Sequence, residues 1–353
     1  MKIAVVFGGL YAEHDISIFS FKNFYADIQS AGVSDEIELS SIYYIMRNGK
    51  VQVSSVDLKK PAEFYFKPDN IRPHGLIDAF SMIKGNNEFV YLICDGSMGI
   101  DGRFTSIVNA FGLKGTFGSA LSFGLSRSKF HLNQFVSTNY PDIKIPKTSY
   151  ITCIDDLEKV FKIFENQQII VKPSSLGSSI YTELFLCGKE SHGQIKELIK
   201  KILQYDLRAL VQEYIKGEEY GCYCMERKGH VEVLATKHFA KKDAFLSTTD
   251  KYKAGTGSHD AYIKEGIPAI SEFSLQVFKD TDCQNLSRMD FIVTVEKEIY
   301  FLENNCNPAL RGFIEAYKER YTSCNAYDML KIFIENHNNR RRLKTDYHMD
   351  FEY

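Results

Sequence analysis

The chain lacks the patterns that mark several common classes of protein. No two of its eight cysteines have CxxC spacing, which favours reduced thiols in a cytosolic protein over disulfides or a zinc site. No apolar run approaches the length of a membrane span, and the run at 3–7 is too short for a signal peptide. Its 43 basic and 45 acidic residues are interspersed, with a net charge of −2, which argues against nucleic acid or a membrane as partner. We expect a cytoplasmic protein that acts on small molecules.

Two common phosphate-binding motifs are also absent. The apolar strand at 3–7 opens into Gly8-Gly9, but the GxGxxG spacing of dinucleotide-binding folds is missing. The loop 172–179, KPSSLGSS, lacks the GxxxxGK[ST] pattern of a P-loop. Its backbone N–H groups and hydroxyls can still bind phosphate oxygens, with Lys172 adding a charge. A plain loop without a ligand is the alternative.

The hydrophobic pattern predicts an α/β protein of two or three domains. An apolar strand at 89–94, a glycine-rich loop at 95–102 and a helix at 104–111 form a strand, loop and helix unit of the α/β type. Unit boundaries are predicted at 1–118, 119–218 and 219–353. Further predicted elements are a hairpin at 40–53, helices at 154–165 and 190–204, strands at 168–172 and 209–215, a hairpin at 219–238, and helices at 312–320 and 326–336.

The segment 285–310 is the strongest candidate for the chemistry. Two β-favouring runs joined by three charged residues predict an antiparallel hairpin. Glu303 and Asn305 leave one face of the second strand, and Asp290 stands on the first strand, where it can meet them. Two carboxylates and an amide oxygen are hard ligands suited to Mg²⁺ beside phosphates. The alternative is a strand end with solvated acids.

Motifs spread over the chain carry a family resemblance. In order, they are Gly8-Gly9 with Glu13-His14-Asp15-Ile16-Ser17, the loop 95–102, Ser128-Lys129, the loop 172–179, the segment 212–219, Phe245 to Lys251-Tyr252, Arg288-Met289-Asp290-Phe291, and the segment 303–309. Together they resemble the D-alanyl-D-alanine ligases of the ATP-grasp class over essentially the whole chain. The resemblance implies an N-terminal open α/β domain followed by two α+β subdomains that sandwich a nucleotide.

The resemblance also implies roles for individual residues. ATP would be bound by Lys129, Lys172, Ser179, Gln212, Tyr214, Ile215, Glu219, Phe245 and Lys251. Two Mg²⁺ ions, or Mn²⁺, would be bound by Asp290, Glu303 and Asn305, so alanine at Asp290 or Glu303 is expected to abolish turnover and leave the fold intact. Arg288 would stabilise an oxyanion, with a backbone N–H near Ala309 as second donor. Glu13 and Ser178 would lie near the amino group of the first substrate, and Tyr252 would close over the γ-phosphate within a lid at 246–260.

The chain departs from the family around the amino-acid sites. The family's loop histidine is Asp95 here, and its PG pair with the following serine and leucine has become Pro308-Ala309-Leu310-Arg311. We therefore expect ATP use with altered substrates. Arg311 offers a fork of donors to an anionic acceptor, although it could instead pair with Glu315 on a helix surface.

Three functions follow from these motifs. The first is an ATP-dependent carboxylate–amine ligase that acts through an acyl phosphate, with an α-amino acid as first substrate and an acceptor other than D-alanine. The second is a D-alanine–D-alanine ligase of bacterial peptidoglycan synthesis. The third is a phosphotransferase or a nucleotide sensor, against which the retention of Arg288 argues, since a kinase forms no tetrahedral carbon intermediate. A homodimer is possible, as in many members of the family.

Overall fold

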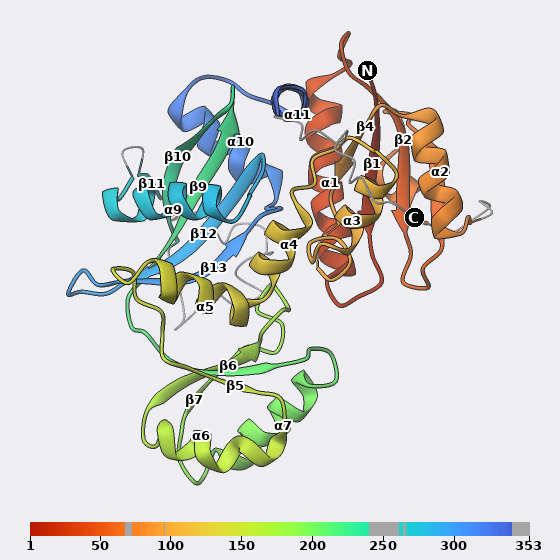
Figure 1. The fold of residues 1–353 in the computed structure, drawn as a ribbon. Coiled ribbons are helices and arrows are strands. Elements are labelled where there is room, and N and C mark those ends of the chain that lie inside the picture. Colours follow the sequence, from red (N-terminus) through yellow and green to blue (C-terminus); the bar gives the residue numbers. More distant parts are fainter. Residues whose placement is uncertain (68–72, 95, 240–260, 264–265, 341–353) are drawn as a thin grey trace, which may run out of the picture.

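The computed structural model describes residues 1–67, 73–94, 96–239, 261–263 and 266–340. Three β-sheets with helices packed on them make up this part of the chain (Figure 1). None of its helices is both long enough and apolar enough to cross a membrane. The architecture is thus of the mixed α/β kind that the sequence predicts.

The N-terminal sheet has the strand order β3-β2-β1-β4. Its strands are β1 (Lys2–Gly8), β2 (Glu38–Ile45), β3 (Val51–Ser55) and β4 (Phe89–Leu92). Strand β1 is parallel to β2 and β4, whereas β3 pairs antiparallel with β2. Apolar residues of β1 alternate between two cores, so both faces of this sheet are covered.

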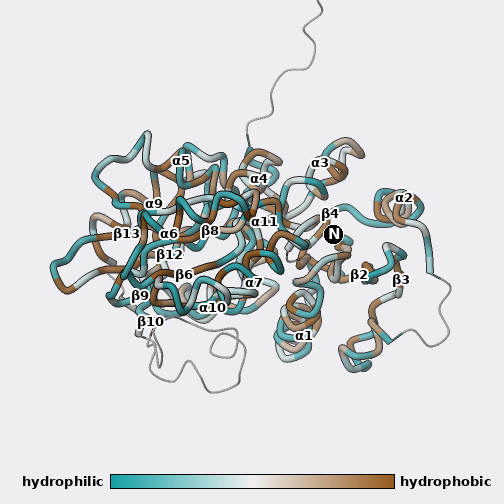
Figure 2. The backbone as a smooth tube through the Cα atoms, turned by 90° about the horizontal axis from the view of Figure 1, so that it is seen from below, coloured by the Kyte–Doolittle hydropathy of each residue, from teal (hydrophilic) through white to brown (hydrophobic). Residues whose placement is uncertain are grey.

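Helices cover the two faces of this sheet. Helix α1 (His14–Ala31) and the C-terminal helix α11 (Ala326–Asn339) share one core with it. On the opposite face lie α2 (Leu76–Asn86) and α3 (Arg103–Ala110). Hydrophobic and hydrophilic residues alternate along α1 and α2 (Figure 2), as expected for helices with one face on a sheet. A short 3₁₀ helix, η1 (Ala62–Tyr65), packs beside α1.

The central sheet is antiparallel, with the order β5-β8-β6-β7. Its strands are β5 (Thr148–Ile151), β6 (Gln168–Pro173), β7 (Glu183–Leu186) and β8 (Ala209–Glu213). One face carries α6 (Leu157–Ile163), preceded by η2 (Ile154–Asp156), and α7 (His192–Ile202), which form a core with it. The apolar stripe of α7 (Ile195, Leu198, Ile199 and Ile202) is buried there.

The C-terminal sheet is also antiparallel, with the order β11-β10-β9-β12-β13. Its strands are β9 (Glu218–Arg227), β10 (His230–Phe239), β11 (Ala261–Ile263), β12 (Leu286–Val293) and β13 (Ile299–Asn305). Helices α4 (Ala120–Arg127), α5 (Lys129–Asn139) and α9 (Pro268–Asp280) share one core with it, and α10 (Leu310–Arg320) shares the other. Helices α4 and α5 therefore contact β13, although their residues fall within the predicted central unit.

Every helix and strand named in the sequence-based prediction is present, with ends shifted by a few residues. The region predicted as one helix at 154–165 is η2 followed by α6, and the strand predicted at 89–94 ends at Leu92. The pattern did not predict α2, α4, α5 or α9. The three unit boundaries stay a prediction.

Candidate active site

A pocket between the central and C-terminal sheets brings together most of the predicted nucleotide residues. Strands β6 and β8 and the loop after β6 line it on one side, and β9, β12, β13 and the start of α5 line it on the other. The predicted residues that line it are Lys129, Lys172, Ser178, Ser179, Gln212, Tyr214, Ile215, Glu219, Asp290 and Glu303. Their positions in the sequence span 175 residues (from 129 to 303), so it is the fold that gathers them.

The acidic end of the pocket lies on the predicted hairpin. Asp290 on β12 and Glu303 on β13 are cross-strand partners, which places both carboxylates on one face. Lys129, the first residue of α5, is buried, and its Nζ lies 3.1 Å from Glu303 Oε2. The same Nζ donates to the Leu176 carbonyl at 3.3 Å. One amine thus joins the acidic strand to the loop that follows β6.

Arg288 is bound to Asp290 by two hydrogen bonds. Its Nε donates to Oδ1 and its Nη2 to Oδ2, each at 2.8 Å, in the fork geometry that makes such pairs strong. Burial lowers the pKa of Arg288, but Asp290, Tyr223 and Glu303 together raise it, and the net direction is upward. Arg288 therefore stays charged beside the predicted metal ligands.

The hairpin suits a divalent cation that is shared with phosphates. The described residues contain no group of three or more His, Cys, Asp or Glu side chains that could hold a metal by themselves. Mg²⁺ typically takes one or two carboxylates together with phosphate oxygens and water, and Asp290 with Glu303 supplies that set. The third predicted ligand, Asn305, accepts a hydrogen bond from the Asn307 backbone N–H at 3.1 Å and is not among the residues that line the pocket.

The loop after β6 has a backbone shaped for anion binding. Ser178 and Ser179 have φ of 57° and 58°, which is uncommon for residues other than glycine and persists where the surroundings hold it. Left-handed turns of this kind direct successive N–H groups to one side and form anion-binding concavities. The Ser174 carbonyl accepts from the Lys129 N–H at 3.1 Å, so the loop and α5 are held together.

A buried carboxylate joins this loop to the N-terminal sheet. Glu13, which precedes α1, is 2% exposed. Its Oε1 accepts from Arg127 Nη2 and from the Gly177 backbone N–H, the latter at 3.0 Å. Ser17 supports this end of α1, because its Oγ accepts from the Gly8 N–H and donates to the Ile93 carbonyl, both at 2.8 Å. The predicted Glu13 and Ser178 thus lie close together, as Gly177 is adjacent to Ser178.

Sequence reasoning missed Arg127. This residue ends α4, two positions before Lys129, and its side chain is 9% exposed. It is separated from Glu13 by 114 residues, so no local pattern indicates the contact. Its position beside the Ser128-Lys129 motif was the available signal.

Several predicted site residues lie elsewhere. Ala309 precedes α10, and Arg311 lies in its first turn with a side chain that is 67% exposed. Arg311 Nε lies 3.4 Å from Glu315 Oε1, which is the surface pairing that the sequence left as the alternative. Asp95, Phe245, Lys251 and Tyr252, with the lid expected at 246–260, fall outside the described residues.

Arg311→Ala is expected to have little effect. An exposed pair four residues apart on a helix contributes roughly 0.3–0.5 kcal/mol, and solvent screens the charge. Steady-state kinetics with varied acceptor should give a KM within about twofold of the wild-type value by this reasoning. A tenfold or larger rise in that KM would restore Arg311 to the acceptor site.

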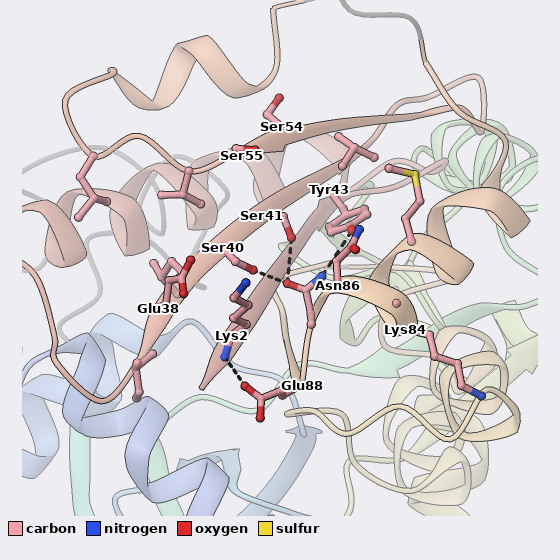
Figure 3. A pocket seen from close by; sticks show the side chains of 18 of the residues that line it. Lys2, Glu38, Ser40, Ser41, Tyr43, Ser54, Ser55, Lys84, Asn86 and Glu88 are labelled. Carbon is pink, nitrogen blue, oxygen red and sulfur yellow. Dashed lines mark hydrogen bonds between the residues drawn. The ribbon is translucent and has the colours of Figure 1, made fainter.

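A second cavity in the described part of the chain lies at the N-terminal sheet. It has a volume of about 1190 Å³ and lies at the start of the strands of the N-terminal sheet (Figure 3). Its polar groups bond to one another: Ser41 Oγ donates to Asn87 Oδ1 at 3.0 Å, and the Lys2 backbone N–H donates to Glu88 at 2.8 Å. It contains none of the predicted site residues, and we assign it no chemistry.

Comparison with known proteins gives a family match for one segment of the chain. Residues 154–319 match the family described as the D-Ala–D-Ala ligase C-terminus, and this segment holds Lys172, Asp290 and Glu303. Over this segment the chain is therefore similar to the C-terminal part of the D-Ala–D-Ala ligases.

Solved structures show the same fold over nearly the full length. A D-alanine–D-alanine ligase from Coxiella burnetii has a TM-score of 0.75 and 18% identity, with 96% of this chain and 95% of that chain covered. The VanG D-Ala:D-Ser ligase from Enterococcus faecalis has a TM-score of 0.74 and 21% identity, with coverage of 95% and 99%. A ligase from Bacillus anthracis, solved in complex with ATP, has a TM-score of 0.62 and 19% identity, with coverage of 96% and 97%. The predicted ATP-grasp fold is confirmed.

Proposed function

We propose that this ligase joins the carboxylate of an α-amino acid to an amine other than that of D-alanine, through an acyl phosphate made from ATP. The observation that carries the proposal is the pocket in which Lys129, Lys172, Asp290 and Glu303 converge. A carboxylate is a poor electrophile, so it must first be phosphorylated. That step depends on positioning and charge neutralisation rather than on a general acid or base.

Each group in the pocket has a place in this reaction. Lys129 and Lys172 would bind phosphate oxygens, with the N–H groups near Ser178 and Ser179. Bound Mg²⁺, held by Asp290 and Glu303, would neutralise charge on the transferred phosphoryl group.

Arg288 would act in the second step. Two of its three nitrogens bind Asp290, and the third would donate to the oxyanion that forms when the amine attacks the acyl phosphate.

The acceptor is less closely defined than the nucleotide site. The argument for an acceptor other than D-alanine rests on the altered segment after Pro308, where Ala309 and Leu310 stand in place of the family's glycine and serine. The outward position of Arg311 gives it no support. A D-alanine–D-alanine ligase is the competing function. A panel of substrates decides between the two functions. Cytoplasmic localisation and a homodimer stay predictions.

A substrate panel tests the proposal directly. ATP-dependent phosphate release should be measured with D- and L-amino acids and hydroxy acids, singly and in pairs, and any product should be identified by mass. We expect release only with an α-amino acid as first substrate, and a product whose mass equals the two substrates less one water. Efficient joining of two D-alanines would favour the competing function. Phosphate release without any acceptor product would favour a phosphotransferase.

A further inference from the structure

Two buried thiols lie side by side next to the predicted metal hairpin. Cys283 precedes β12, and Cys306 directly follows β13. Both are free cysteines, 7% and 6% exposed, and their Sγ atoms are 3.1 Å apart. A disulfide bond is about 2.05 Å long, so closure of this gap by roughly 1 Å would bond the two sulfurs. The reaction proposed above uses neither thiol.

Polar side chains surround the two sulfurs. Ser122 and Ser126 come from α4, which lies beside β13 (Figure 1). Ser126 Oγ lies 2.9 Å from Cys306 Sγ, and Ser122 Oγ lies 3.4 Å from each sulfur. Asn304 Nδ2 lies 3.5 Å from each sulfur as well. The thiols therefore sit in a polar cluster within an otherwise apolar core.

Cys283 is the thiol better suited to attack an oxidant. The hydrogen bond from Cys306 lowers the pKa of Cys283, although burial opposes this effect, and the thiolate is the form of cysteine that reacts. Cys306 is then close enough to complete a bond.

The network around the sulfurs extends to residues that are predicted to act in the reaction. Asn304 lies between Glu303 and Asn305 on β13, so its side chain leaves the opposite face of the strand. Its Oδ1 accepts a hydrogen bond from Ser287 Oγ at 2.5 Å, and Ser287 is adjacent to Arg288 on β12. Asn304 thus joins the sulfurs to both strands of the hairpin, and movement of the sulfurs would be passed to both.

The turn that carries Cys283 is held in place. Asp282 and Asn285 have φ of 53° and 60°, values that residues other than glycine keep only where their surroundings hold them. Asn285 Nδ2 also donates to the Thr116 carbonyl at 3.3 Å. We therefore expect that closure of the sulfurs moves Cys306, and with it the end of β13, more than it moves this turn.

We propose that Cys283 and Cys306 form a redox switch, in which a peroxide oxidises both thiols to a disulfide that slows turnover at the adjoining hairpin. The Cys283 sulfur attacks one peroxide oxygen, the O–O bond breaks, and a sulfenic acid and one water are formed. The Cys306 thiol then attacks the sulfenic sulfur, the S–O bond breaks, and the second water leaves as the S–S bond forms. Two thiols and one hydrogen peroxide thus give one disulfide and two waters. Because both thiols are mostly buried, we expect a slow reaction that only a small oxidant such as hydrogen peroxide can start.

The displacement is small, but it lies where the reaction is sensitive to position. A misplacement of about 1 Å can lower a rate roughly 100-fold, because the reacting groups must stay aligned. Disulfide formation also replaces the contacts that Ser126 and Asn304 make with the Cys306 thiol. The disulfide itself does not depend on the ligase function, whereas its effect on turnover rests on the function proposed above.

The test oxidises the full chain and follows both the thiols and the turnover. Reduced protein is treated with hydrogen peroxide, and the remaining thiols are alkylated before digestion with trypsin in the absence of reductant. Peptides 280–288 and 298–311 should then be linked, with a mass below their sum by two hydrogen atoms. ATP-dependent phosphate release should fall at least about tenfold as the linked peptides form, and dithiothreitol should restore it. Cys283→Ser should keep its activity under the same treatment.

Two controls separate this pair from other thiols. Cys153→Ser is the matched variant, because it removes an exposed thiol and should lose turnover on oxidation as the wild type does. Cys222 and Cys224 provide a control within the same digest. Their Sγ atoms are 4.0 Å apart and both residues are fully buried, so both should stay reduced.

Three outcomes would overturn the switch. They are the absence of linked peptides when Cys153 is oxidised, linked peptides with unchanged turnover, and an equal loss of turnover in Cys283→Ser. If Cys283→Ser does not fold, Cys306→Ser replaces it, and the linked peptides of the wild type are measured in either case. Reduced wild type without ligase turnover would refute the ligase function alone. The switch is then judged by Mg²⁺-dependent binding of a non-hydrolysable ATP analogue, whose Kd should rise at least about tenfold on oxidation; an unchanged Kd would overturn it.

Discussion

Glu303→Gln should lower kcat by at least about 100-fold, because the loss of a metal ligand removes several kcal/mol of charge stabilisation from phosphoryl transfer. The side chain keeps its size and remains 30% exposed, so the unfolding temperature should move by no more than a few degrees. The measurement is ATP-dependent phosphate release at saturating Mg²⁺, with thermal unfolding followed in parallel.

Glu298→Gln provides the control for this experiment. Glu298 lies in the turn of the same hairpin and pairs with Lys144 at 2.5 Å, where it is 41% exposed, so the variant should retain wild-type turnover. If Glu303→Gln kept more than a tenth of the activity, the assignment of the hairpin as the metal site would be wrong.

Asp290 differs from Glu303 in one physical respect. The sequence predicts that alanine at either position leaves the fold intact, but Asp290 is buried and holds both nitrogens of the Arg288 fork. Removing one partner of a buried pair leaves the other charge uncompensated, at a cost of roughly 3–5 kcal/mol. Asp290→Ala should therefore be unstable as well as inactive, and Asp290→Asn is the variant that tests activity alone.

The hairpin of β12 and β13 could be predicted from local sequence alone. Alternating β-favouring residues on either side of a charged turn predicted β12 and β13, and a spacing of two placed Glu303 and Asn305 on one strand face. Neighbouring strands in the sequence pair with one another in most sheets, so Asp290 could be placed opposite them. Phosphate binding by the loop 172–179 was also predicted from local sequence. Small residues, hydroxyls and a lysine are the groups that bind phosphate oxygens.

Contacts between segments far apart in the sequence could not be predicted from local patterns. Helix α5 buries Leu132 and Val136 together with the polar Asn133, so it shows only a weak apolar period and was missed. The Glu13–Arg127 pair joins the residue before α1 to the last residue of α4 over 114 residues, which no local spacing encodes. Arg311 is the reverse case, because its chemistry suits an anion but its side chain is 67% exposed and lies 3.4 Å from Glu315.

Lys129→Met should weaken the binding of an ATP analogue by roughly 10- to 100-fold, since a charge-assisted hydrogen bond is worth roughly 1.5–3 kcal/mol. Lys129 Nζ lies between Glu303 Oε2 and the Leu176 carbonyl, next to both the acidic strand and the phosphate loop. A bound phosphate would therefore reach a cation that is already positioned. Methionine fills a similar volume without the charge, so the helix should stay packed on the sheet.

The measurement is calorimetric titration of the analogue with and without Mg²⁺. Lys144→Met is the control, as it removes an exposed lysine that pairs with Glu298 on the same hairpin. Because Lys129 also neutralises Glu303, its loss should weaken the nucleotide more in the absence of Mg²⁺ than in its presence, where the metal ion takes over part of that role. Equal affinities for the wild type and Lys129→Met under both conditions would remove Lys129 from the nucleotide site.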